Sequence, residues 1–132
     1  MEWNEGCEHG IKWQDEQHKL LLENINALFD SVLMGSADEE AFLKTIKFLE
    51  EYSEEHFRQE EFFMHKHGYP RQENHINEHR NFTEDLKKLT NGQHYTGIES
   101  SVELVNKLNN WFFEHTQTTD KYLAQFLCKY EK

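Results

Sequence analysis

Four long segments of the chain carry apolar residues at steps of three and four, which is the spacing of one helix face. The first stripe consists of Leu21, Leu22, Ile25, Leu28, Phe29, Val32 and Leu33, and the fourth begins with Ile98, Val102, Val105 and Leu108. One proline and six glycines leave few points at which a helix would end. The pattern predicts an all-α fold, an up-down-up-down antiparallel four-helix bundle, because short connections make successive helices antiparallel neighbours.

The length of 132 residues fits a single domain, which we expect to span residues 1–132. This domain would consist of an N-terminal arm, four helices and a short C-terminal helical segment. The expected bounds are 1–14 for the arm, about 15–35, 38–66, 71–91 and 97–116 for the helices, and 117–130 for the last segment.

Capping signals indicate where these helices begin and end. Asp15 is expected to cap the first helix. The segments Ser36–Glu39 and Thr96–Glu99 have the form of capping boxes. Gly68 is expected to end the second helix, and Pro70 suits the first turn of the third.

The net charge, the apolar runs and the cysteine content limit the partners and the location that we expect for this protein. The net charge of -11 disfavours nucleic acid and anionic membrane surfaces, which bind basic patches. No apolar run approaches the ~20 residues of a membrane span, and the first residues lack a secretory signal pattern. The two cysteines make no disulfide framework, so a reduced, cytoplasmic protein is expected. A Cys7–Cys128 bridge is the alternative, because an even-numbered bundle brings its termini to one end.

Polar residues continue the apolar stripes at one end of each helix. Five imidazoles and a carboxylate are involved: His18, His56, Glu60, His75, His79 and His115. A single pair at i, i+4 also occurs on solvated faces, so no pair is decisive alone. In an antiparallel bundle, however, all six fall at one level and face inward. Imidazoles and carboxylates are costly to bury without partners, so this level predicts a bound cation.

Asp120 lies five residues after His115, about 140° away around a regular α-helix. A π-bulge, with its i to i+5 pattern, would bring the two side chains to one face, and such bulges are frequent at functional sites. We therefore predict a π-bulge or similar irregularity between them. A regular helix would instead leave Asp120 in solvent.

The set His18, His56-x3-Glu60, His75-x3-His79 and His115-x4-Asp120 resembles the ligand signature of the hemerythrins, specifically the single-domain bacterial kind. The flanking residues resemble it too: Asp15-Glu-Gln-His18, Glu61 after Glu60, the Gly68-Tyr69-Pro70 turn, and Trp111 before His115. The resemblance runs from Gly10 to Leu127.

This resemblance implies a non-haem di-iron centre, two iron ions with a bridging oxo or hydroxo group, that binds dioxygen reversibly. One iron would be held by His75, His79 and His115, and the other by His18 and His56, with Glu60 and Asp120 bridging both. The second iron then has one protein ligand fewer, which leaves an open position for dioxygen.

Phe112, Thr116 and Trp111 are the candidate residues of the oxygen pocket. Many hemerythrins carry a branched aliphatic residue in place of Phe112 and an isoleucine or similar residue in place of Thr116. A phenylalanine would narrow the pocket and a threonine adds a hydroxyl group. The alternative is that both are packing variants.

The favoured function is reversible dioxygen binding, as a carrier, store or supplier. The alternatives are an oxygen or redox sensor domain of a longer signalling protein, a di-iron enzyme acting on peroxide or nitric oxide, and a structural bundle without metal. We expect no enzyme, because histidine-rich ligation stabilises high-valent iron less well than the carboxylate-rich sites of ferritin-like bundles.

Several other polar residues match no ligand position. They are His9, His65, His67 and His94. His65 and His67 are expected at the surface, near the C-terminus of a helix. Glu55 and Glu61 are expected on a solvated face, and no protein partner is indicated.

Overall fold

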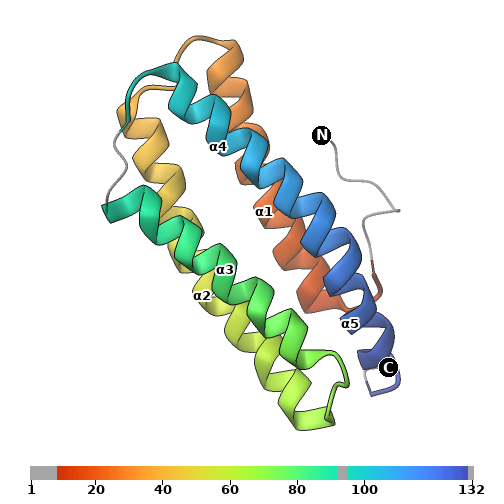
Figure 1. Cartoon of the computed structure of the whole chain (residues 1–132). Helices are drawn as coiled ribbons and strands as arrows, with labels where there is room; N and C mark the ends of the chain where they lie inside the picture. The colour runs from red at the N-terminus through yellow and green to blue at the C-terminus, as the bar shows by residue number, and fades with distance from the viewer. Residues whose placement is uncertain (1–8, 92–94, 131–132) are drawn as a thin grey trace.

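The computed structural model describes residues 9–91 and 95–130 (Figure 1). Its four long helices are α1 (Lys12–Leu33), α2 (Glu39–His67), α3 (Gln72–Asn91) and α4 (Ile98–Trp111). A π-helical segment, Phe112–Thr119, continues α4 and leads into α5, Asp120–Leu127. The described residues contain no strand, so the predicted all-α fold is confirmed.

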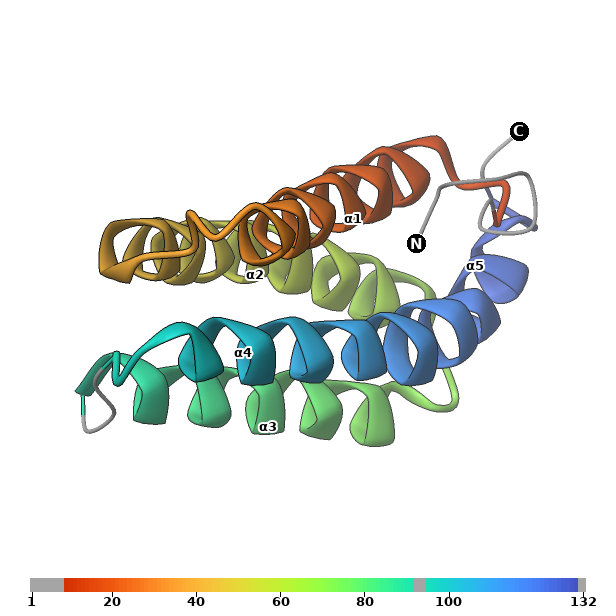
Figure 2. The same cartoon turned by 90° about the horizontal axis from the view of Figure 1, so that it is seen from above.

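The helices form two layers of antiparallel neighbours. Figure 2 shows α1 and α2 in one layer and α4 and α3 in the other. Helix α1 packs against α2 and α4, and α2 packs against α3. Successive helices run in opposite directions (Figure 1), which confirms the predicted up-down-up-down bundle.

The described residues form two separate apolar clusters in the interior. The larger is formed mainly by Leu21, Leu22, Ile25, Leu28, Phe42, Ile46, Leu49, Leu86, Leu104, Val105, Leu108 and Phe112. The smaller contains Ile11, Met64, Tyr69, Leu123, Ala124 and Leu127. Along each of the four long segments of the bundle, the expected metal ligands fall between the residues of these two clusters. The arm and α5 therefore close the end of the bundle over the polar level.

The first helix begins earlier than predicted, and Asp15 does not cap it. The N-cap is Ile11, and Asp15 lies in the first turn. Its carboxylate accepts hydrogen bonds from the backbone N–H groups of His9 (2.8 Å) and Gly10 (3.0 Å). Asp15 thus ties the preceding arm to the helix, because an acidic group in the first turn can reach back to free backbone donors.

Neither predicted capping box forms as expected. Asp38, and not Ser36, is the N-cap of α2, and its carboxylate accepts a 2.9 Å hydrogen bond from Ala41 N–H. The N-cap of α4 is Gly97, without a side-chain cap. By contrast, Gly68 does end α2: it adopts a left-handed conformation (φ 65°), and the next N–H, of Tyr69, bonds to Met64 O.

Four residues assigned to the core stripes are exposed in the structure. Phe29 and Leu33 at the end of α1 are 41% and 69% exposed. Ile98 and Val102 at the start of α4 are 41% and 40% exposed. All four lie at the end of the bundle opposite the polar level.

Two further expectations concern the surface of the protein. Within the described residues, no helix is long and apolar enough to cross a membrane. Cys128 is exposed and Cys7 lies outside the described residues, so the reduced state stays a prediction and the Cys7–Cys128 bridge stays its alternative.

The corrected cap of α2 can be tested by mutation. Replacing Asp38 with alanine should lower the free energy of unfolding by about 1 kcal/mol, since it leaves Ala41 N–H without its acceptor. The Ser36→Ala variant is the matched control and should change stability by less than half as much. Urea denaturation of the metal-free protein measures both, and a larger loss for Ser36→Ala would contradict this assignment of the cap.

Candidate metal centre

The structure brings all seven expected ligands to one buried level. His18 comes from α1, His56 and Glu60 from α2, His75 and His79 from α3, His115 from the π-helical segment and Asp120 from the start of α5. Each of these residues is buried, with at most 2% of its surface exposed. The helix spacing achieves this, because residues four apart on one helix face lie one above the other.

The π-helical segment brings Asp120 to the same face as His115. The backbone N–H of Asp120 donates to the carbonyl of His115, five residues back, and not to the carbonyl four residues back as in an α-helix. The predicted irregularity between these two residues is confirmed. As a result Asp120 is fully buried and its carboxylate lies among the imidazoles.

Glu60 faces two groups of histidines at once. Its Oε1 lies 3.2 Å from His75 Nε2 and 3.0 Å from His79 Nε2. Its Oε2 lies 3.4 Å from His56 Nε2. The two oxygens of one carboxylate are thus divided between the two groups.

Asp120 divides its oxygens in the same way. Oδ1 lies 2.8 Å from His75 Nε2 and 3.1 Å from His115 Nε2. Oδ2 lies 2.8 Å from His18 Nε2 and 3.5 Å from His56 Nε2. Together the carboxylates define a three-histidine side and a two-histidine side. On each side, one ligand atom from every residue lies within 4.8 Å of all the others.

The arrangement fits metal ions better than hydrogen bonds within the protein. Although the atoms are close together, His56 Nε2, His115 Nε2 and Asp120 Oδ1 are buried without a well-formed hydrogen bond. Buried polar atoms normally have partners, and imidazole and carboxylate are suitable ligands for iron. The Nε2 atoms of His18, His75 and His79 do form hydrogen bonds with the carboxylates. The three atoms without such a bond are available to an ion shared between the side chains.

Polar partners on the outer side of three histidines orient the rings. His79 Nδ1 donates to Glu61 (2.9 Å), and His115 Nδ1 donates to Glu78 (2.7 Å). His56 Nδ1 donates to the amide oxygen of Gln17. Such bonds fix the tautomer that leaves Nε2 free for a metal.

The sequence reasoning missed these partners and misplaced one of them. Glu61 was expected on a solvated face, but its carboxylate contacts a buried histidine because it follows Glu60 directly and points toward α3. Glu78 also accepts a hydrogen bond from Thr119, 2.9 Å away. Glu78 lies three residues after His75, a spacing that places it beside the ligand stripe of α3 and could have indicated it.

Aromatic rings pack against the imidazoles and surround the polar level with apolar side chains. Phe57 stacks on His79 with ring centroids 3.9 Å apart, and Trp111 stacks on His115 at 4.0 Å. Tyr52 stacks on His56 at 5.2 Å. These contacts hold the rings in place on both sides of the centre.

The three oxygen-pocket candidates lie in different surroundings. Trp111 contacts His115, which belongs to the three-histidine side. Phe112 is fully buried in the larger apolar cluster. The hydroxyl of Thr116 donates to the carbonyl of Phe112 within its own helix. The hydroxyl proton of Thr116 is therefore used in a hydrogen bond to the backbone.

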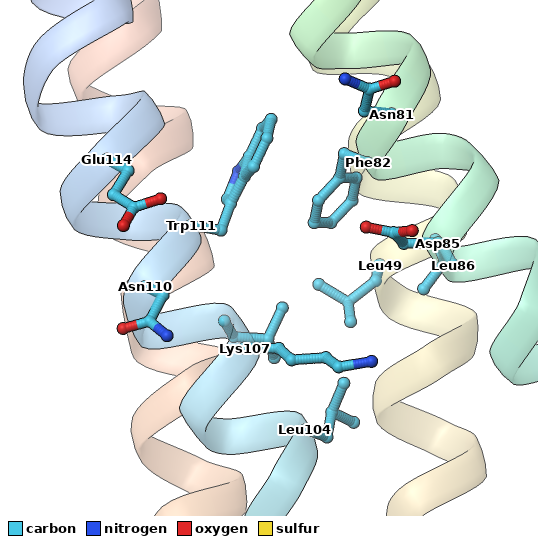
Figure 3. Close-up of a pocket in the computed structure, with 11 residues that line it drawn as sticks. Leu49, Asn81, Phe82, Asp85, Leu86, Leu104, Lys107, Asn110, Trp111 and Glu114 are labelled. Atoms are coloured by element: carbon cyan, nitrogen blue, oxygen red, sulfur yellow. The ribbon is translucent and has the colours of Figure 1, made fainter.

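Two pockets border the centre from outside. One, of about 270 Å³, lies between α3 and α4, and Figure 3 shows Trp111 reaching across it toward Phe82. Trp111 separates this pocket from His115, on which it stacks. The other, of about 360 Å³, lies between α1 and α2 and is lined by His56, Tyr52, Gln17 and Glu55 among others. It lies on the two-histidine side.

The remaining histidines are not among the seven expected ligands. His65 is exposed, as predicted. His67 is half-buried and stacks on Tyr130 at 3.8 Å. His9 is also half-buried, with its ring centroid 5.5 Å from that of His18. His94 lies outside the described residues.

Comparison with known proteins identifies the family. The model of the hemerythrin HHE cation-binding domain matches residues 9–127. The chain belongs to the hemerythrin family. The match covers all seven expected ligands and both apolar clusters, and it confirms the resemblance found in the sequence.

Individual hemerythrins are similar over most of their length. A bacteriohemerythrin of Pseudomonas paraeruginosa is 29% identical over 118 residues, covering 89% of this chain and 75% of the relative. A bacteriohemerythrin of Methylococcus capsulatus is 27% identical, covering 84% and 83%. A myohemerythrin of Theromyzon tessulatum is 30% identical, covering 90% and 87%. These relatives are named as hemerythrins and not as enzymes, in agreement with the expectation from the sequence.

In this hemerythrin, the buried charges stabilise one another when no metal is bound. Burial alone would lower the pKa of His75, but Asp120 and Glu60 raise it to about 10. Burial likewise opposes the charge on His115, but Asp120 and Glu78 raise its pKa to about 9. Burial raises the pKa of Asp120, yet His115, His18 and His56 outweigh it and hold that pKa well below its usual range.

These shifts predict how the metal-free protein responds to alkali. The stability contributed by His75 and His115 is fully present below the unfolded histidine pKa of about 6.5. It is lost as the pH rises toward the folded values of about 9 and about 10. Urea denaturation at increasing pH should show a steady fall in the free energy of unfolding. The metal-loaded protein should lack this fall, because its ligands have already lost their protons. Equal stability of the metal-free protein across this range would contradict the prediction.

The outer carboxylates should strengthen metal binding. Replacing Glu78 with glutamine keeps the shape but removes the charge that accepts from His115 Nδ1. Metal affinity should fall about 10- to 100-fold. Glu54→Gln, at an exposed position on α2, is the control and should have little effect. Competition with a chelator of known affinity measures both variants.

Proposed function

We propose that the protein binds two iron ions joined by a solvent-derived oxo or hydroxo bridge. In this proposal His75, His79 and His115 hold one iron, and His18 and His56 hold the other. Glu60 and Asp120 bridge the pair. The division of each carboxylate between two groups of histidines supports two ions, because a single ion would need the oxygens on one side only.

We further propose that the protein binds dioxygen reversibly, as a carrier, store or supplier. The single observation that carries this proposal is the unequal number of histidines on the two sides of the carboxylates. The side formed by His18 and His56 has one imidazole fewer and so leaves room for an external ligand. When bound, the iron pair would supply the electrons and the open coordination position that dioxygen requires.

The surrounding residues support reversible binding over oxidation of a substrate. The larger apolar cluster closes the polar level on one face, and the smaller cluster closes it on the other. Such closure limits the entry of water and anions, which would displace a bound gas and promote irreversible oxidation. Histidines supply five of the seven proposed ligands, so the site carries less negative charge than a carboxylate-rich oxygenase site. The cytoplasmic location expected from the sequence stays a prediction.

An optical titration of the purified protein tests the proposal. Iron analysis should first give about two irons per chain, one for each histidine group. Air added to the anaerobically reduced protein should produce a charge-transfer band, and removal of oxygen with argon should reverse it. A band that decays to an oxidised form within seconds would favour the sensor or redox alternative. One zinc and no iron would refute the di-iron centre.

A histidine variant tests which side binds dioxygen. His56→Ala removes a proposed ligand of the two-histidine side and should abolish the reversible band, while the protein stays folded. His65→Ala, an exposed histidine on the same helix, is the matched control and should retain the band. Unchanged spectra in His56→Ala would refute the role proposed for this residue. Circular dichroism of both variants verifies that the bundle is intact.

A further inference from the structure

Gln14 is a polar residue of the centre that belongs to none of the proposed ligands. It lies on α1 one turn before His18, and its side chain is fully buried in the same stripe as His18, Leu21 and Leu22. Burying an amide costs free energy unless its donors and acceptor are satisfied. The contacts of this amide therefore indicate its role.

The orientation of the Gln14 amide is determined by its neighbours. Nε2 lies 2.9 Å from Glu60 Oε2 and 3.2 Å from the backbone carbonyl of Asp120. An ionised carboxylate and a carbonyl accept hydrogen bonds and donate none, so the atom facing them must be the NH₂ group. Both amide protons are thus used, and Oε1 must point the other way.

Gln14 contacts the two-histidine side of the centre. Glu60 Oε2, to which it donates, is the oxygen that faces His56. His18, one turn further along α1, belongs to the same side. The amide therefore lies on the two-histidine side, which is the side where an external ligand is proposed to bind.

Gln14 Oε1 has no hydrogen-bond partner within the described residues, although it is buried. Leaving such an acceptor unsatisfied destabilises a protein noticeably, and buried acceptors are normally satisfied by protein or by water. An oxygen acceptor can be satisfied only by a group that carries hydrogen. A bare anion or an apolar gas does not satisfy it.

We propose that Gln14 Oε1 accepts a hydrogen bond from a hydrogen-bearing ligand, water or hydroxide, held at the His18 and His56 side. Gln14 is then a specificity-determining residue: it favours ligands that carry hydrogen and disfavours bare anions such as azide. This inference rests on the proposed di-iron function, because the ligand it describes occupies the open side of that centre. It goes beyond that function by naming the class of ligand that occupies the open side when dioxygen is absent, with which dioxygen and anions must compete.

Azide binding to the oxidised, iron-loaded full chain tests the selectivity. In the wild type, azide must displace the hydrogen-bonded ligand and then lies near the lone pairs of Oε1. Gln14→Leu removes both penalties, so azide should bind about tenfold more tightly, the scale of one unsatisfied buried acceptor. Asn24→Leu is the matched control: it removes another amide of α1, one that donates to Leu20 O of its own helix. Its azide affinity should equal that of the wild type, and equal or weaker binding by Gln14→Leu would overturn the proposal.

A high-resolution structure of the iron-loaded wild type provides a test that needs no variant. It should contain a non-protein oxygen about 2.5–3.2 Å from Gln14 Oε1, the range of a hydrogen bond. Direct ligation of iron by Oε1, or an Oε1 that contacts only carbon atoms, would overturn the proposal.

Iron analysis separates this inference from the function on which it rests. Both measurements begin with protein that holds about two irons per chain, one for each histidine group. A chain that takes up no iron would overturn both the proposed function and the role of Gln14. Iron-loaded protein that fails the azide or structural test would overturn the role of Gln14 alone.

Discussion

The structure depends on how seven ionisable side chains are accommodated inside a small helical bundle. Their burial is unfavourable unless opposite charges or metal ions compensate for the lost hydration. In the metal-free chain, Asp120 and Glu60 outweigh burial and raise the pKa of His75 to about 10, and Asp120 and Glu78 raise the pKa of His115 to about 9, so both histidines hold their protons near neutral pH. Metal ions would replace those protons. The same side chains therefore stabilise one another without metal and provide the donor atoms that would bind it.

The polar level needs apolar clusters on both of its faces. The larger cluster occupies the middle of the bundle, and the smaller one joins Ile11 of the arm to Leu123 and Leu127 of α5. Without the second cluster, the histidines would lie at an open end of the bundle and exchange with solvent. The C-terminal helix consequently contributes to the candidate metal centre in two ways: it supplies Asp120 and it covers the proposed ligands.

The two sides of the centre differ in the groups that support them. On the three-histidine side, the carboxylates Glu61 and Glu78 accept from His79 and His115. On the two-histidine side, the neutral amide of Gln17 accepts from His56, and its own NH₂ group donates to Gln59 at 2.8 Å. Anionic acceptors make an imidazole a stronger donor to metal than neutral ones do. The outer residues thus reinforce the asymmetry already present in the number of histidines.

The sequence by itself determined the helix stripes, the level shared by the histidines and the need for an irregular step before Asp120. These features follow from the 3.6-residue period and from the high cost of burying unpaired charge, which act along the chain. The tertiary structure alone decided which carboxylate oxygen faces which histidine, that Glu61 turns toward His79, and that the Gln14 amide leaves one acceptor unsatisfied. It also decided that Asp38 caps α2 and that Phe29 and Leu33 stay exposed. These outcomes depend on how each helix is rotated and shifted relative to its neighbours. The residue pattern within a single helix does not determine that arrangement.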